Sequence, residues 1–151
     1  MELKQFNIRV YAIILNEVKD SVLLSDEFQK NMRMTKFPGG GLQLGEGTLD
    51  CLKREVLEEL GQEIIILNHF YTTDFFQKAF FYDNMQLISI YYLAMFQEKP
   101  KFKISEKPFD YGADENGRQS FRWIKLKDIS PDTFTLPVDK RVGEMLLNQK
   151  F

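Results

Sequence analysis

Hydrophobic residues along this chain fall into short runs that are separated by polar turns. Runs rich in β-branched and aromatic side chains favour β-strands. The sequence predicts strands over 6–15, 21–24, 63–70, 75–82, 87–96 and 119–126. Because the run over 87–96 is the longest apolar one, we expect it to lie at the centre of a sheet.

Two other segments have the 3.6-residue periodicity of amphipathic helices. Their apolar stripes are Leu49, Leu52, Val56 and Leu60 in the first, and Val138, Val142, Met145 and Leu146 in the second. We expect helices over 48–60 and 137–149, and loops over the polar stretches 26–33 and 100–117. Strands interleaved with two helices predict an α/β fold, an α/β/α sandwich in which helices cover both faces of a mixed sheet.

Composition indicates one folded domain over residues 1–151, long enough to bury a core. Hydrophobic residues make up 44% of the chain and aromatic residues 14%, which is typical of a globular protein. The net charge of −2, from 20 basic and 22 acidic residues, argues against a broad nucleic-acid-binding surface. No signal peptide or membrane-spanning apolar run is visible, so we expect a cytoplasmic protein with no membrane partner.

The candidate chemistry is concentrated in a glycine-rich turn and the helix that follows it. We expect the Thr48 hydroxyl to cap this helix and Gly61 to end it in the left-handed conformation. Glu55, Glu58 and Glu59 are spaced i, i+3 and i+4, so they share one helix face. Neighbouring carboxylates repel each other unless a cation lies among them, and Mg²⁺ or Mn²⁺ prefers such oxygen ligands. The sequence therefore predicts a divalent-metal site on this helix.

The segment from Gly40 to Gln62 resembles the Nudix box, G-x5-E-x7-R-E-U-x-E-E-x-G-U, in which U is a bulky aliphatic residue. The matching positions are Gly40, Glu46, Arg54, Glu55, Val56, Glu58, Glu59 and Gly61. One position departs from the pattern, because Gln62 stands where an aliphatic residue is expected; Ile64 could supply that contact instead. The alternative is an acidic, solvated helix behind a glycine-rich loop, but such a helix would not require the remote glycine, glutamate and arginine.

The resemblance implies a Nudix-type sandwich and a pyrophosphohydrolase that uses Mg²⁺ or Mn²⁺. The implied metal ligands are the Gly40 carbonyl and the carboxylates of Glu55, Glu58 and Glu59. Glu55 could alternatively be the base that activates water, while Arg54 and Glu46 would form an ion pair that holds the turn against the helix. The implied substrate is a small nucleoside diphosphate derivative or a nucleoside triphosphate, and not a nucleic acid. A homodimer is compatible with the resemblance, because many relatives are dimers.

Several residues outside the box are candidates for binding the substrate. They are Arg33, Lys36, Phe76, Tyr82 and Glu115. The two cations precede the glycine turn and could reach phosphates, with surface solvation as an equal alternative. The two aromatic residues belong to a cluster that could stack on a nucleobase, although aromatic residues in a strand more often belong to the core. The cluster consists of Phe75, Phe76, Phe80, Phe81 and Tyr82. The glutamate, in the long loop before the tryptophan-bearing strand, is either a further functional acid or a solvated loop residue.

Two reactive residue types favour structural interpretations. Cys51 has no visible His or Asn partner, so we interpret it as a small buried side chain and not as a nucleophile. His69, the only histidine, follows an apolar run and is interpreted as a sheet residue. The alternative to a hydrolase is a Nudix-fold module that binds or senses a nucleotide without turnover. An isomerase on the same fold would need a thiol outside the box, and the only cysteine lies inside it.

Overall fold

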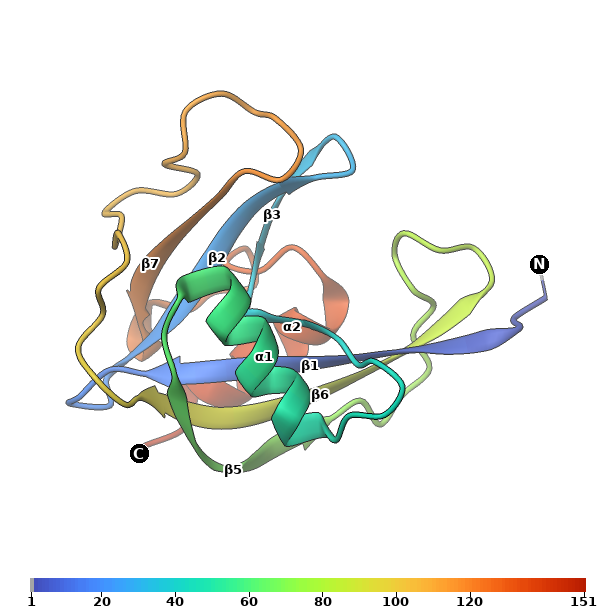
Figure 1. Cartoon of the computed structure of the whole chain (residues 1–151), viewed down its shortest axis with the longest axis horizontal. Helices are drawn as coiled ribbons and strands as arrows, with labels where there is room; N and C mark the ends of the chain where they lie inside the picture. The colour runs from blue at the N-terminus through green and yellow to red at the C-terminus, as the bar shows by residue number, and fades with distance from the viewer. Residues whose placement is uncertain (1) are drawn as a thin grey trace.

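The computed structural model describes residues 2–151, and its two helices cover opposite faces of one mixed β-sheet (Figure 1). The elements are β1 (Gln5–Leu15), β2 (Ser21–Gln29), β3 (Met32–Lys36), β4 (Gly39–Gly41), α1 (Thr48–Leu60), β5 (Ile64–Thr72), β6 (Met85–Phe96), β7 (Gln119–Lys125), the 3₁₀ turn η1 (Leu126–Asp128) and α2 (Pro137–Leu147). This arrangement confirms the predicted α/β sandwich.

The sheet is built around β1, in the strand order β3-β2-β1-β6-β5. β1 runs parallel to β6 along its whole length, and β6 pairs antiparallel with the edge strand β5. The predicted interior position of the run over 87–96 is therefore confirmed. On its other side β1 meets β2 only where Leu15 lies opposite Val22, and the short strand β4 pairs with residues 9–11 in the middle of β1. β7, which is not part of this strand order, pairs antiparallel with β2.

Each helix packs on its own hydrophobic core. The core under α1 contains Val10, Ala12, Ile14, Cys51, Leu52, Val56 and Leu60. The core under α2 contains Tyr11, Ile13, Leu15, Val138, Val142 and Leu146. Successive side chains of a strand point to opposite faces, so β1 supplies alternate residues to the two cores. This double burial explains why β1 reads as a continuous apolar run. Leu49 lies outside the buried stripe of α1 and is exposed.

The prediction of a loop over 26–33 is wrong, because β2 continues to Gln29 and β3 begins at Met32. The polar side chains are accommodated in the sheet by pairing across strands. Asp26, which is fully buried, accepts a hydrogen bond from the Thr35 hydroxyl at 2.6 Å and forms an ion pair with Arg122 at 2.7 Å. The sequence pattern could not reveal the strand, because each buried charge is compensated by a residue distant in sequence.

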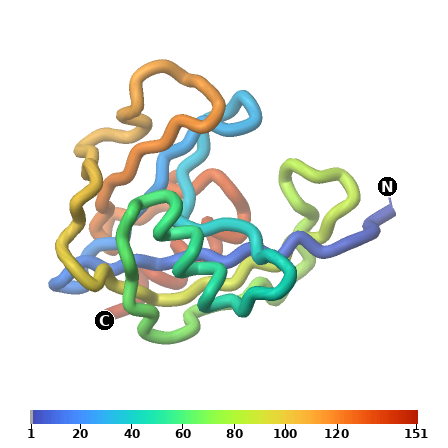
Figure 2. The backbone as a smooth tube through the Cα atoms, in the orientation of Figure 1, coloured from blue at the N-terminus to red at the C-terminus, as the bar shows by residue number. Residues whose placement is uncertain are grey.

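The prediction of a strand over 75–82 is also wrong, since residues 73–84 form a loop that bridges to the sheet only at Lys78. Its aromatic side chains are not core: Phe75, Phe76, Phe80 and Tyr82 are 42%, 62%, 55% and 45% exposed. Consecutive aromatic residues lack the period-two alternation that would bury one face of a strand. Figure 2 shows this loop beside the N-terminal end of β1, where the Lys4 amide donates to the Asn84 carbonyl.

The ends of α1 are only partly as predicted. Gly47, not Thr48, is the N-cap residue, and the Thr48 hydroxyl forms a 2.7 Å hydrogen bond with the Tyr92 hydroxyl. The Gly47 amide donates to the Asp50 carboxylate at 3.2 Å, so Asp50 and not Thr48 supplies the side-chain hydrogen bond at the start of the helix. Gly61 ends the helix with φ 66°, in agreement with the prediction.

The remaining segments agree closely with the sequence. Residues 100–117 form an irregular loop, interrupted by a single bridge at Ile104. α2 begins at Pro137 as predicted and ends at Leu147. Within residues 2–151, neither helix is long and apolar enough to cross a membrane.

A buried acid in α2 gives the fold a measurable pH dependence. The Asp139 side chain accepts a hydrogen bond from the Tyr91 hydroxyl at 2.6 Å through Oδ1, while its buried Oδ2 has no partner among residues 2–151. Burial raises the pKa of Asp139 from 3.8 to about 6, although Tyr91 and Lys36 oppose the rise. A carboxyl whose pKa is higher in the folded state contributes stability below pH 3.8, and this contribution is lost as the pH rises through about 6.

We therefore expect Asp139→Asn to melt at a higher temperature than the wild type at pH 8, and this difference to shrink as the pH falls below about 6. The amide keeps an oxygen for Tyr91 but removes the buried charge. A shift of about two pKa units corresponds to at most roughly 3 kcal/mol in the free energy of unfolding. Thermal melts at several pH values measure this, with the exposed Asp132→Asn as the control. A difference that stays constant with pH would contradict the assignment.

Candidate active site

A pocket of about 410 Å³ opens between the start of β1, the glycine strand β4 and α1. Its wall includes Glu55 and Glu59 from α1, Arg9 and Tyr11 from β1, and residues 79–82 of the aromatic loop. A larger cavity of about 610 Å³ lies between the β1–β2 turn and the end of β6, and no α1 carboxylate lines it. The acidic chemistry predicted from the sequence is therefore located at the smaller pocket.

Gly40 allows the backbone of β4 to lie directly against the Glu55 carboxylate. A Cβ built at Gly40 would overlap that carboxylate, so no other residue type fits without displacing it. Glu55 Oε1 accepts a 3.0 Å hydrogen bond from Arg54 Nη1. The close approach brings the Gly40 backbone and the Glu55 carboxylate to the same point of the pocket, as a shared ligand role would require.

Glu59 has the most unusual environment of the three glutamates. Its Oε2 atom is buried and has no hydrogen-bond partner among residues 2–151. The pKa of Glu59 is raised to about 8, mainly by burial and in addition by the nearby Glu27 and Glu55, while Lys36 opposes the rise. An unpartnered carboxylate oxygen close to another carboxylate suits a hard divalent cation, which would supply the missing positive charge. The residues present thus fit a Mg²⁺ or Mn²⁺ ion.

Glu58 lies beside this carboxylate pair and not in the pocket wall. Its side chain is 60% exposed and forms an ion pair with Arg54 at 3.3 Å. Within residues 2–151, no three His, Cys, Asp or Glu side chains are grouped closely enough to hold a metal ion. The structure thus brings Glu55, Glu59 and Gly40 together, and leaves Glu58 bound to the arginine.

The predicted ion pair between Arg54 and Glu46 is confirmed. Arg54 donates to both carboxylate oxygens of Glu46, from Nη2 at 2.7 Å and from Nε at 3.0 Å. Nη2 also donates to the Gly41 carbonyl at 3.1 Å. These hydrogen bonds from Arg54, together with one from the Gln43 amide, lower the pKa of Glu46 to about 2. A two-point bond of this kind fixes the glycine turn against α1.

Lys36 lies in the pocket as predicted, but the positive charge of its ammonium group is already balanced by the carboxylate of Glu27. Lys36 Nζ lies 3.5 Å from Glu27 Oε2 and 5.4 Å from the centre of the Tyr11 ring. Glu27 in turn accepts hydrogen bonds from Ser25 Oγ at 2.8 Å and from Gln119 Nε2 at 3.2 Å. Glu27 was missed as a pocket residue because its segment was predicted to be a loop.

Tyr82 also lies in the pocket wall, where Phe80 and Phe81 of the same loop accompany it. Phe76 belongs to this loop but does not line the pocket. Phe80 and Phe81 belong to the aromatic cluster that the sequence singled out for stacking on a nucleobase. What the sequence analysis missed is that the cluster lies in a loop, and the signal for this is the lack of period-two alternation.

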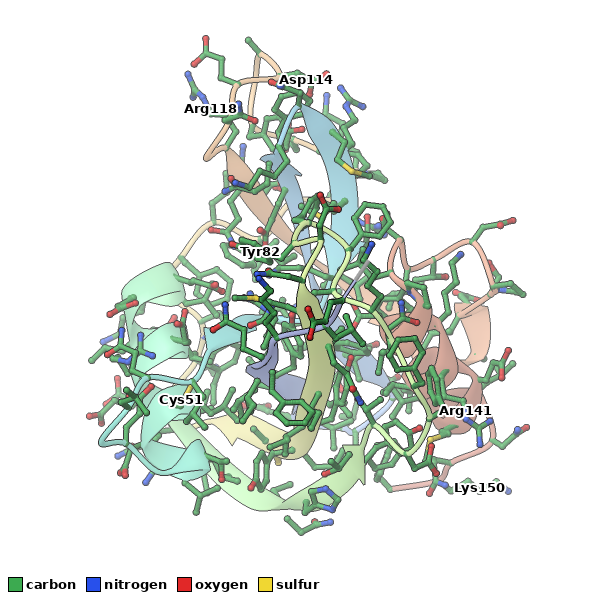
Figure 3. The ribbon with its side chains drawn as sticks, turned by 90° about the vertical axis from the view of Figure 1, so that its right-hand side faces the viewer. Cys51, Tyr82, Asp114, Arg118, Arg141 and Lys150 are labelled. Atoms are coloured by element: carbon green, nitrogen blue, oxygen red, sulfur yellow. The ribbon has the colours of Figure 1, made fainter. Side chains whose placement is uncertain are left out.

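Arg33 and Glu115 are placed away from the pocket by the structure. Arg33 forms an ion pair with Asp114 at 3.0 Å, and Glu115 forms one with Arg118 at 3.1 Å. Figure 3 shows Asp114 and Arg118 together at one end of the molecule, well separated from Cys51 on α1. The β2–β3 hairpin and the 100–117 loop meet there, so these charges are committed to each other.

Cys51 and His69 have the structural roles that we expected. The Cys51 side chain is buried, and its thiol donates to the Gly41 carbonyl at 3.5 Å. Burial raises the pKa of this thiol to about 11, which keeps it neutral. His69 lies on the edge strand β5, where its Nε2 forms a 2.8 Å hydrogen bond with Thr72. Neither side chain lines the pocket.

Gln62, the one departure from the box pattern, has a specific polar partner. Its Nε2 donates to the Lys99 carbonyl at 3.1 Å, and its Oε1 accepts from the Lys101 amide at 2.5 Å. Gln62 thereby anchors the beginning of the 100–117 loop to the end of α1, while Ile64 is buried in the core as expected. Gln62 therefore acts on the packing of the helix end, and it does not line the pocket.

Arg54→Ala should lower both the melting temperature and enzymatic turnover. The change leaves Glu46 and the Gly41 carbonyl without their donor, which releases the turn from α1. Thermal melts and initial rates measure the two effects. Arg118→Ala, which removes an exposed arginine paired with Glu115, is the control and should change neither. A loss of turnover at an unchanged melting temperature would instead assign Arg54 a direct contact with the substrate.

Comparison with solved structures identifies the fold. Three solved structures share the fold: a MutT protein from Methanosarcina mazei Go1 (22% identity, 97% of this chain and 95% of that chain, TM-score 0.64), a MutT NUDIX hydrolase from Burkholderia pseudomallei (18%, 96% and 100%, 0.68) and a NUDIX hydrolase from Nitrosomonas europaea (19%, 92% and 86%, 0.68). A search of curated proteins found no match.

The family model of the NUDIX domain matches residues 5–145, which is nearly the whole chain. The match includes the glycine strand, α1 and every residue of the pocket described above. The chain therefore belongs to the Nudix family, a family of pyrophosphohydrolases.

Proposed function

We propose that this protein is a divalent-metal-dependent hydrolase that cleaves the pyrophosphate bond of a small nucleoside diphosphate derivative or of a nucleoside triphosphate. The observation that carries the proposal is the buried, unpartnered Oε2 of Glu59 beside Glu55 and the glycine strand. Such a pair of carboxylates is unfavourable without a cation and becomes favourable with one. The metal is proposed to be Mg²⁺ or Mn²⁺.

Each residue of the box has a role in this proposal. Glu59, Glu55 and the Gly40 carbonyl would hold the metal, with Glu58 as a further ligand. A bound divalent metal neutralises charge on phosphate oxygens and lowers the pKa of a coordinated water. Glu55 also qualifies as the base, because only its Oε1 is bonded to Arg54 and its Oε2 is left to accept a proton from water. Arg54 keeps Glu55 in this orientation.

The aromatic loop supports a nucleotide as the substrate. Phe80, Phe81 and Tyr82 enter the pocket wall opposite the carboxylates of α1. Stacking of one base on an aromatic ring contributes about 1–3 kcal/mol and tolerates different bases. We therefore propose loose selectivity for the base and sharper selectivity for the diphosphate.

Glu59→Gln should abolish metal-dependent hydrolysis while the protein stays folded. The amide has the size of the carboxyl group and cannot ionise in this buried place, so the melting temperature should be unchanged or higher. Turnover should fall by at least about 100-fold, since metal ions supply several kcal/mol of charge stabilisation in the transition state. Initial rates with Mg²⁺, with Mn²⁺ and with EDTA measure this. The control is Glu63→Gln, a change of an exposed glutamate just beyond α1. Full turnover in a folded Glu59→Gln protein would refute the metal assignment.

A substrate panel tests the reaction and its size limit. We expect Mg²⁺-dependent turnover among ADP-ribose, nucleotide sugars, dinucleoside polyphosphates and nucleoside triphosphates, and none with capped RNA. A capped RNA would need a basic track for its phosphates, whereas this chain has a net charge of −2. Selective decapping would overturn the proposed substrate class. Binding of these compounds without any turnover would instead favour a nucleotide-binding or sensor module.

A further inference from the structure

Arg9 differs from every other arginine of the described chain in having no carboxylate partner. The other arginines each have a carboxylate oxygen within 4.0 Å; they are Arg33, Arg54, Arg118, Arg122 and Arg141. Arg9 is nevertheless only partly exposed, and it lines the pocket that contains Glu55 and Glu59. A cation in such a place is incompletely solvated and feels the charges of Glu55 and Glu27 only from beyond ion-pair distance, so it can still bind an anionic ligand directly.

The guanidinium of Arg9 is held from one side only. Its Nε donates to the Tyr11 hydroxyl at 2.6 Å, and its carbon lies 5.6 Å from the centre of the same ring. Within residues 2–151, Nη1 and Nη2 make no hydrogen bond, and neither is a buried polar atom lacking a partner. The two terminal nitrogens are therefore accessible, with their orientation set by the bond through Nε.

Strand pairing places this free end beside the glycine strand. Arg9 is in register with Gly41 across β1 and β4. A Cβ built at Gly41 would lie 3.7 Å from Arg9 Nη1, so the guanidinium lies close over the glycine backbone. Gly40, the next residue of the same strand, lies against the Glu55 carboxylate. The guanidinium of Arg9 thus lies near one residue of β4, and the carboxylate of Glu55 lies near the next residue of the same strand.

Lys30 and Lys36 are the other cations of this wall, and both differ from Arg9. Lys36 is paired with Glu27, whose carboxylate also accepts hydrogen bonds from Ser25 and Gln119, and Lys30 is exposed to solvent. Arg9 is partly buried and donates only to the Tyr11 hydroxyl, while Glu55 and Glu27 act on it through their charge without forming an ion pair within 4.0 Å. A guanidinium with two free nitrogens can bind two oxygens of one phosphate in a forked arrangement, which an ammonium cannot do.

We propose that Arg9 binds a phosphate of the substrate through Nη1 and Nη2, and that Tyr11 is the positioning residue that aims the guanidinium. This inference rests on the proposed hydrolysis of a pyrophosphate-containing nucleotide. It identifies Arg9, which the sequence alone did not single out, as a substrate-binding group. The pyrophosphate would lie between Arg9 on β1 and the carboxylates of α1.

The test combines kinetics with a binding measurement that needs no turnover. For the best substrate of the panel, Arg9→Gln should raise KM by roughly 10- to 100-fold, as expected for a lost charged hydrogen bond, with a smaller effect on kcat. Calorimetry with inorganic pyrophosphate and Mg²⁺ should show a similar loss of affinity. Arg9→Lys should recover part of this affinity, and Tyr11→Phe should lose several-fold. Arg118→Gln is the matched control and should bind like the wild type.

The outcomes separate this inference from the proposed function. If the wild type hydrolyses the panel and Arg9→Gln has unchanged KM and pyrophosphate affinity, the inference fails and the hydrolase stands. If the wild type hydrolyses nothing but binds pyrophosphate in an Arg9-dependent way, the inference stands and the hydrolase fails. Absence of pyrophosphate binding by the wild type also counts against the inference. If Arg9→Gln does not fold, the folded Arg9→Lys and Tyr11→Phe proteins decide, and wild-type affinity in both would overturn it.

Discussion

Arg54 joins the glycine turn to α1, and the geometry of the pocket depends on this contact. The guanidinium bonds Glu46 and the Gly41 carbonyl in the turn, and Glu55 and Glu58 on the helix. It is a planar group with five donors, which lets one side chain fix two backbone segments at once. With the turn held in this way, the Gly40 backbone can rest against Glu55, and a side chain at position 40 would push the two apart.

The same arrangement brings acidic side chains together at the pocket, where they do not stabilise the fold. The Oε2 atom of Glu59 is buried without a hydrogen-bond partner among residues 2–151, and Glu27 and Glu55 add to the rise of the Glu59 pKa. Stability would favour replacing this carboxylate, so its presence is better explained by a ligand than by packing. Asp139 shows that a buried acid can also occur in a purely structural setting, where a tyrosine hydroxyl binds one oxygen. The two acids differ in that only Glu59 lies in the wall of an open pocket beside a second carboxylate.

Local signals predicted the parts of this protein that depend on local physics. The α1 stripe, the Gly61 helix end and the Arg54–Glu46 pair depend on spacing within about one to three helical turns, which the sequence displays directly. The polar strands β2 and β3 were hidden because their charges are compensated across paired strands, Asp26 by Arg122 of β7 and Glu27 by Lys36 of β3, and sequence periodicity does not show such pairing. Arg9 was missed for the same reason, since its significance lies in the absence of a partner that only the folded structure can reveal. The aromatic loop was misread because its high aromatic content was taken as a strand signal, although its residues lack the period-two alternation of a half-buried strand.

The pairing of charges also decides which pocket groups remain for a substrate. Glu27 balances the charge of Lys36 on one wall, Arg54 is bound to the glycine turn and Lys30 is exposed, which leaves Arg9 as the partly buried cation of the pocket without an ion pair. Across the glycine strand, Glu55 lies beside Glu59, whose ionised form is disfavoured by burial and would be stabilised by a cation. A simple anion would satisfy Arg9 but would be repelled by the carboxylates, and a metal alone would do the reverse. A pyrophosphate that carries a divalent cation presents both charges at once, so a single ligand would complete both sides of the pocket.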